Sequence, residues 1–226
     1  MSNTKKKGMK KLNQILLYIV LCVCIFNVRT IQARDAYVPT TGDVRIPIIL
    51  VEFQDNTFTL TNPVEAINQL FNTTGGTNPS AKGSVHTSYY ETSLGQLNLQ
   101  YDIYGPYKLS REMSYYGGNI GNNSDKNATA LVIEAANLAE AAGVDFAQYD
   151  NDGDGNIDNV SIITAGHNEA EGASADHIWP HYSTIYSYTV ISGKRLLGYL
   201  MTSELCGSSG NIQSGIGTYC HEFGHG

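Results

Sequence analysis

The sequence predicts a single domain of the α+β class. Short apolar or alternating runs, typical of strands, mix with segments of helical periodicity, and strands and helices do not alternate regularly. No fixed-period repeat and no linker of distinct composition divides the chain. With 226 residues, of which 42% are hydrophobic and 15% charged, the chain is long enough to bury a substantial core.

The first strand and the first helix are predicted one after the other. The run "VRIPIILVEF" from Val44 to Phe53 is apolar on both faces, which predicts a central strand, and Pro47 within it indicates a bulge or a local edge. In "TNPVEAINQLFN", Asn62 is expected to cap a helix with Pro63 in its first position, and "TTGGTNP" ends that helix.

A second strand and the most regular helix follow. The stretch "GQLNLQYDIYGPYKL" alternates apolar and polar residues from Leu97, which predicts a half-buried strand ending at Gly105-Pro106. From Ala128, apolar residues recur on one helical face, and Gly143 stands where a left-handed residue would end the helix.

Two further segments predict strands in the second half of the chain. The run "VSIITAG" from Val160 is typical of a buried strand. The run "KRLLGYLMTSEL" from Lys194 follows "ISG" and is expected to form the second arm of a hairpin.

The first residues have the pattern of an export signal. Five lysines precede an uncharged run from Ile15 to Phe26, and "TIQAR" offers a cleavage site after Ala33. The apolar run is short against the roughly 20 residues that span a bilayer, although a retained anchor stays open as the alternative. We therefore expect a signal peptide at residues 1–33, a domain over residues 34–226, and a protein that is secreted or held in the cell envelope.

The net charge of the chain limits the classes of molecule that it is expected to bind. Cleavage after Ala33 removes five lysines and Arg29 and leaves 8 of the 14 basic side chains against 21 acidic ones, a net charge near −13. This composition predicts no basic groove for nucleic acid and contact with a membrane only through the signal peptide during export. An acidic exported chain also attracts divalent cations.

The motif "HEFGH" at the end of the chain indicates a zinc centre. His221 and His225 are four residues apart, so on a helix they share a face and can bind one ion. Glu222 lies beside them as the base that would accept a proton from metal-activated water. Ser214 precedes the motif and is expected to cap its helix.

An acidic loop, "YDNDGDGNIDNV", indicates a calcium site. Gly155 stands at the sixth position of an EF-hand-like loop, but Ser161 replaces the glutamate of the twelfth, and a strand follows. We therefore expect a structural calcium loop with an EF-hand-like start, and the alternative is a solvated acidic turn. The candidate calcium ligands are Asp150, Asp152, Asp154, Asn156 and Asp158.

The other histidines are weaker candidates for metal ligands. His177 and His181 lie four residues apart around the only tryptophan, but Pro180 disfavours a regular helix there, so structural hydrogen bonding is expected. His86 and His167 stand alone and are expected to be surface or core residues.

Two cysteines, Cys206 and Cys220, remain after cleavage of the signal. An oxidising compartment would let them pair, and the alternative is two buried free thiols.

Taken in order, these segments resemble the immune inhibitor A type of secreted zinc metalloprotease, the peptidase M6 family, from about Val44 to Gly226. The resemblance is carried by "PIILVEFQD", "GSVHTSYYETSLGQLNLQYDIYGPY", "DNDGDGNID" followed by "ITAG", "IWPH" and "HEFGH". It implies a zincin-like fold with a mixed sheet and an active-site helix, endopeptidase activity on protein or peptide substrates, and structural calcium. His221 and His225 would be zinc ligands and Glu222 the general base.

The chain departs from the family pattern in two places. Families of this kind continue into a glycine turn and a third metal ligand, of which only Gly226 is present. We therefore expect an incomplete catalytic domain that, alone, binds zinc substoichiometrically and has no measurable activity. Thr164 stands where a histidine is expected before Ala-Gly, which leaves the role of His167 open.

A function of a different class is the alternative. The chain would then be a calcium-dependent extracellular binding module in which the zinc helix is vestigial.

Overall fold

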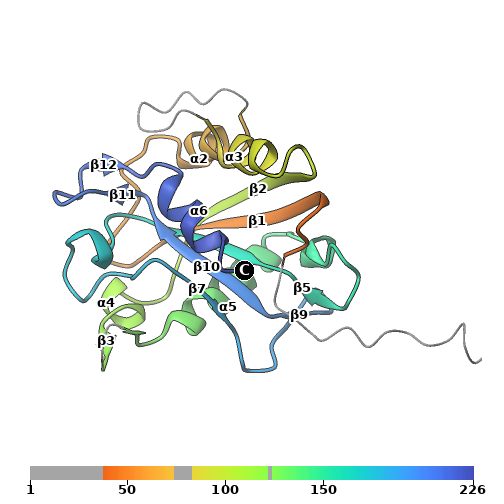
Figure 1. Cartoon of the computed structure of the whole chain (residues 1–226). Helices are drawn as coiled ribbons and strands as arrows, with labels where there is room; N and C mark the ends of the chain where they lie inside the picture. Colours follow the sequence, from red (N-terminus) through yellow and green to blue (C-terminus); the bar gives the residue numbers. More distant parts are fainter. Residues whose placement is uncertain (1–37, 74–82, 122–123) are drawn as a thin grey trace, which may run out of the picture. The chain divides into compact units, whose positions relative to one another are not determined.

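A five-stranded mixed sheet forms the middle layer of the protein (Figure 1). The computed structural model describes residues 38–73, 83–121 and 124–226, so the predicted signal peptide at residues 1–33 lies outside the described residues. The strand order is β2-β1-β6-β10-β7, with β7 antiparallel to β10 and the other neighbours parallel. The strands are β1 (Gly42–Glu52), β2 (Leu97–Lys108), β6 (Val160–Thr164), β7 (His181–Thr184) and β10 (Gly198–Ser203).

Helices cover both faces of this sheet. Alternate residues of β1 are buried on opposite faces, which explains why its sequence is apolar on both sides. Ile49 and Val51 pack on the side of α5, whereas Ile48 and Leu50 pack on the side of α2, α3 and α6. The helices are α2 (Pro63–Asn72), α3 (Val85–Thr92), α5 (Ala128–Ala141) and α6 (Gly217–Phe223). A mixed sheet between helices agrees with the predicted α+β class.

Pro47 lies at a local edge of β1. Pairing of β1 with β6 begins only at Ile48, so a residue without an N–H is tolerated just before it. On the same side of the strand, the Asn151 side chain accepts from the Arg45 N–H (2.9 Å) and donates to the Arg45 carbonyl (3.1 Å). The local-edge prediction is confirmed, and the register irregularity of β1 lies between Ile49 and Val51 instead.

The second strand is longer than predicted. β2 continues through Gly105-Pro106 to Lys108, because the register shift opposite Ile49 and Val51 lets Tyr107 resume pairing with β1. The prediction that the Gly-Pro dipeptide ends this strand is therefore wrong.

The N-termini of α2 and α6 differ in part from the predicted helix caps. α2 begins at Pro63 as expected, but the Asn62 side chain makes no capping hydrogen bond. α6 begins at Gly217 after Ile216, and Ser214 instead donates its backbone N–H to the Glu204 carbonyl (2.8 Å). Asn62 therefore occupies the predicted N-cap position without a side-chain cap, and the prediction that Ser214 caps α6 is wrong. The α5 prediction is confirmed, since the helix begins at Ala128 and Gly143 has a positive φ of 99° just after it.

The helix α3 was not predicted from the sequence. Its N-cap is Ser84, whose side chain accepts from the Thr87 N–H at 3.1 Å. Only Val85 of this helix is buried, so the apolar periodicity that marks longer helices is weak here.

Small elements complete the fold. The predicted hairpin around "ISG" is confirmed by β8 and β9, but the chain then leaves the hairpin at Leu197 and enters the central sheet as β10. The short strands are β3 (Asn119–Ile120), β4 (Ser124–Asp125), β5 (Asn156–Ile157), β8 (Val190–Ile191), β9 (Lys194–Leu196), β11 (Leu205–Cys206) and β12 (Ile212–Gln213). The short helices are α4 (Met113–Tyr116), η1 (Phe146–Tyr149) and η2 (Glu169–Glu171).

Within the described ranges, no helix has both the length and the apolar character needed to cross a membrane.

One buried carboxylate ties the ends of three parallel strands together. Glu204, 1% exposed, follows β10 directly. Its Oε1 accepts from the N–H and hydroxyl of Thr59 (2.7 and 2.8 Å) and from the Leu60 N–H (2.8 Å), beyond the end of β1. Its Oε2 accepts from the Gly166 N–H (2.9 Å), just after β6.

We expect Glu204→Gln to lower the free energy of unfolding by about 2–3 kcal/mol, because an amide NH₂ would face one of these buried N–H donors. Urea denaturation measures the change. Glu91→Gln, on the exposed side of α3, is the matched control and should change stability by less than about 0.5 kcal/mol. Equal effects of the two variants would contradict this role for Glu204.

Candidate metal centres

The helix α6 is attached to the sheet by one aromatic face. Tyr219 and Phe223 lie one turn apart and are 2% and 5% exposed. Tyr219 packs edge-on against Phe71 with ring centroids 4.5 Å apart, and its hydroxyl shares a 2.8 Å hydrogen bond with the Ser161 hydroxyl of β6. Phe223 packs edge-on against Tyr89 at 5.3 Å. Because these residues face the core, positions two residues further along face away from it.

The predicted zinc ligands lie on that outer face. His221 and His225 are both exposed, and their ring centroids are 5.1 Å apart. His225 follows the last residue of α6 by two, yet its N–H still donates to the Glu222 carbonyl (3.1 Å), so the helical course continues to it. Two adjacent imidazoles with accessible nitrogens are a donor set that suits zinc.

Glu222 lies between this outer face and the edge of the sheet. Its side chain is half-buried, and Oε2 accepts from the backbone N–H of Tyr182 in β7 at 3.2 Å. This contact orients the carboxylate beside the histidine pair. Among the described residues, no third His, Cys, Asp or Glu joins the two imidazoles in a cluster of metal-ligand spacing.

The neighbouring histidines have structural hydrogen bonds. His181 Nδ1 contacts the Trp179 carbonyl (2.7 Å) and Nε2 contacts the Tyr199 hydroxyl (3.0 Å). Burial lowers the pKa of His181, against the opposing effect of nearby Glu222. His177 Nδ1 contacts the Ser174 hydroxyl at 3.2 Å. The two histidines do not share a helical face, which agrees with the structural role expected for them.

The lone histidines make contacts with other parts of the fold. His86 Nδ1 contacts the Leu99 carbonyl at 2.7 Å, and its ring stacks on Tyr90. His167 packs against Gly210, where an added Cβ would lie 2.8 Å from its ring.

Three of the five predicted calcium ligands converge. Oxygen atoms of Asp150, Asp152 and Asp158 lie within 4.8 Å of one another. Asp154 and Asn156 instead bond to each other, through the Asn156 N–H (2.7 Å) and side-chain amide (2.6 Å). The structure therefore gathers a carboxylate triad from the loop, with the other two residues bracing its turn.

The burial of Asp150 and Asp158, beside the exposed Asp152, favours a bound cation. The Asp150 side chain is 1% exposed, and its Oδ1 has no hydrogen-bond partner among the described residues. Asp158 is 4% exposed, and burial raises its pKa to about 6 although Asn151 donates two hydrogen bonds to it. Hard carboxylate oxygens at this spacing suit calcium.

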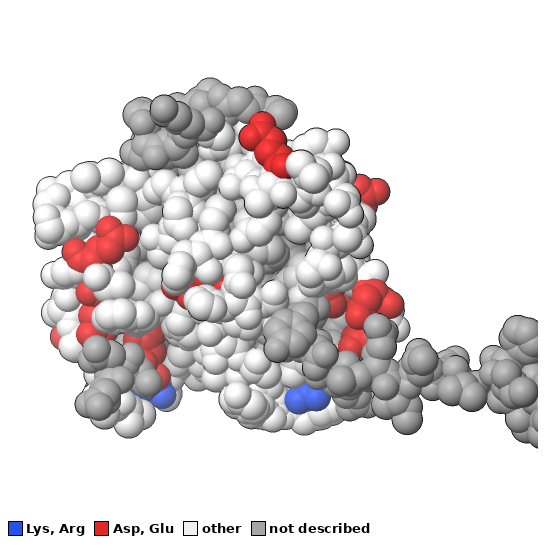
Figure 2. Space-filling model, viewed as in Figure 1, with Lys and Arg blue, Asp and Glu red and all other residues white. Residues whose placement is uncertain are grey.

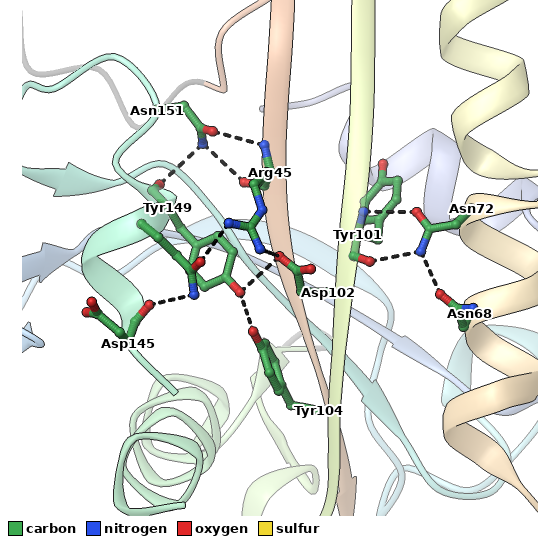
Figure 3. Close-up of polar contacts among 10 residues, drawn as sticks. Arg45, Asn68, Asn72, Tyr101, Asp102, Tyr104, Asp145, Tyr149 and Asn151 are labelled. Carbon is green, nitrogen blue, oxygen red and sulfur yellow. Dashed lines mark hydrogen bonds and ion pairs between the residues drawn. The ribbon is translucent and has the colours of Figure 1, made fainter. Parts of the chain in front are cut away.

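Asn151 connects the loop to the central sheet, and sequence analysis missed it. Besides its contacts with Asp158, its side chain bonds both backbone groups of Arg45 in β1 (Figure 3). Arg45 in turn forms an ion pair with Asp102 of β2 at 2.7 Å, and Asp102 accepts from the Tyr149 hydroxyl at 3.1 Å. Asn151 occupies a position between alternating ligands, so the ligand pattern gave no signal for it.

The two cysteines are free in the structure. Cys206 lies in β11 with its thiol 3.7 Å from the Gln213 carbonyl, whereas Cys220 lies in α6, where burial raises its pKa to about 11. The alternative of free thiols therefore describes this structure, because the two residues belong to elements that do not bring their sulfur atoms together.

Acidic side chains dominate the charged surface. On the face in Figure 2, Asp and Glu form several separate patches, while Lys and Arg occur at few places. This distribution follows from the acidic composition of the chain.

Comparison with known proteins identifies the family. The family model described as immune inhibitor A peptidase M6, catalytic domain, matches residues 39–226. No curated protein matches the chain. The family match covers the central sheet, the acidic loop and α6 together. The chain therefore belongs to the immune inhibitor A peptidase M6 family of metalloproteases.

Proposed function

We propose that this protein is a zinc-dependent endopeptidase that hydrolyses peptide bonds in protein or peptide substrates. The observation that carries the proposal is the exposed pair of imidazoles, His221 and His225, with the oriented carboxylate of Glu222 beside it. Membership of a metalloprotease family supports the same conclusion. The packing of α6 on a mixed sheet supports a zincin-like fold.

His221 and His225 would each donate one ring nitrogen to zinc. At such a site zinc supplies Lewis acidity, which polarises a carbonyl group and makes water more acidic. Catalytic zinc sites usually have three protein ligands, and the described residues contribute two here. We therefore propose that a third ligand outside the described residues completes the centre.

Glu222 would act as the general base. Its Oε2 is held by the Tyr182 N–H, so we assign proton transfer to the other oxygen, Oε1. Oε1 would accept the proton of the attacking water and then deliver it to the nitrogen of the leaving amine. The Tyr182 contact keeps the carboxylate in one orientation through both transfers.

Substrate would bind beside the edge strand β7. This strand is the last of the sheet and its Tyr182 contacts α6 through Glu222. Apart from the Tyr182 N–H, which Glu222 already engages, an extended peptide can add to such an edge by main-chain hydrogen bonds, which recognise backbone and tolerate varied side chains. That mode suits an endopeptidase.

We also propose that calcium binds the Asp150, Asp152 and Asp158 triad as a structural ion, and that the protein is secreted or held in the cell envelope. The buried Asp150 and the loop's attachment to β1 support the first proposal. The lysine-rich start and apolar run of residues 1–33 support the second.

The binding-module alternative is less well supported. It explains the calcium loop but gives no reason for a histidine pair on the outer face of α6 with an oriented carboxylate beside it.

We expect Glu222→Gln to reduce kcat/KM for peptide cleavage by about 10²- to 10⁴-fold with zinc content unchanged, because the amide cannot accept the proton. The measurement is fluorogenic peptide hydrolysis together with metal analysis, on protein that contains the complete zinc site. Glu112→Gln, at an exposed position, is the matched control and should keep full activity. Full activity of Glu222→Gln would contradict the assigned base.

We expect saturating calcium to raise Tm. At a calcium concentration 100 times Kd, binding to the folded state alone adds about 2.7 kcal/mol of stability. Asp152→Asn should abolish the rise, whereas Asp176→Asn, exposed and outside the loop, should keep it. Differential scanning calorimetry with EDTA or calcium makes the comparison. If Tm of the unaltered protein is the same in both buffers, the calcium proposal is wrong.

A further inference from the structure

A lysine from a neighbouring hairpin contacts the most buried ligand of the calcium loop. Lys194, the first residue of β9, places Nζ 2.6 Å from Asp150 Oδ2. The Asp150 side chain is 1% exposed, while that of Lys194 is 32% exposed. The ammonium thus reaches inward from a half-buried position to a carboxylate that solvent does not reach.

The backbone around Lys194 holds it in this position. β9 pairs with β5 inside the acidic loop, and the Arg195 N–H donates to the Gly155 carbonyl at 3.1 Å. The hairpin turn is tied to α5, because the Ser192 N–H donates to Glu140 Oε1 at 2.6 Å. Loop and lysine therefore belong to one connected unit, unlike a flexible surface ion pair.

The three carboxylates of this cluster outnumber the one cation that contacts them. Three carboxylates lie within 4.8 Å of one another, and within that cluster Lys194 contacts Asp150 alone. Asp150 uses Oδ2 for Lys194 and for the Gly155 N–H (3.1 Å), whereas Oδ1 is buried and has no partner among the described residues. Asp150 thus has one oxygen engaged by the lysine and one available to an ion.

We propose that Lys194 is an internal counter-cation that sets the calcium affinity of the loop. It neutralises Asp150 and keeps the loop folded when calcium is absent, and its positive charge opposes the ion when calcium binds to the same carboxylate. This inference rests on the calcium site proposed above. It predicts opposite effects of removing Lys194 in the two states: a less stable calcium-free protein and tighter calcium binding.

The test is to replace Lys194 with an uncharged residue and to measure calcium binding and Tm on the purified protein. For Lys194→Met, we expect Tm in EDTA to fall and the calcium Kd from isothermal titration to drop about tenfold, since ligand charge tunes calcium affinity. The calcium-induced rise in Tm should become larger. Lys108→Met removes the same charge from the exposed end of β2 and should change neither Kd nor that rise.

A second substitution keeps the test decisive if Lys194→Met does not fold in EDTA. Lys194→Gln retains a hydrogen-bond donor for Asp150 without the charge and should also bind calcium more tightly, whereas Lys194→Arg should keep the original Kd.

Two results would overturn the inference. If Lys194→Met and Lys194→Gln keep the original Kd, or lose the same number of degrees of Tm in EDTA and in calcium, Lys194 is only a structural ion-pair partner. If the unaltered protein binds no calcium, the calcium site and this inference both fail, while the role of Glu222 in peptide cleavage is tested independently.

Discussion

The attachment of α6 to the central sheet is the constraint on which the proposed catalytic centre depends. Tyr219 and Phe223 bury one face of a helix of only 7 residues, too short to be stable alone. Burial of two aromatic side chains contributes several kcal/mol. Because the inner face is fixed in this way, the outer face must present His221 and His225 together. Residues outside the proposed ligand set therefore determine the geometry of the proposed metal site.

The acidic loop is connected to α6 through one short strand. Asp158 is followed by Asn159, whose side chain accepts from the Ser161 hydroxyl at 2.9 Å, and Ser161 bonds the Tyr219 hydroxyl. The same loop is tied to β1 by Asn151 and to β9 by the pairing of β5. Ordering of the loop by a cation would thus help to fix the start of β6 and the residue against which α6 rests. Through this connection, a calcium ion bound in the loop would help to position α6 without lying at the proposed zinc centre.

Sequence periodicity predicted the elements whose side chains repeat with a regular burial pattern. β1 and β6 follow from apolar runs, because most positions of β1 and every position of β6 are buried, and α5 follows from the apolar residues that recur on its one buried face. Features that depend on partners distant in the chain were missed. Ser214 looked like a helix cap, but its backbone pairs with Glu204; β2 passes Gly105-Pro106 because β1 realigns beside it. Asn151 bonds Arg45 of β1, and Lys194 contacts the loop from β9, so spacing along the loop does not reveal either residue.

In our proposal, the outer face of α6 is the zinc centre and the acidic loop is a separate site for calcium. The most direct measurement is an anomalous difference map from crystals of the protein grown with both metals, recorded on either side of the zinc absorption edge. We expect a zinc peak between the imidazoles of His221 and His225, next to Glu222, and none at the Asp150 triad. Zinc at the triad, with no peak between the two imidazoles, would contradict it.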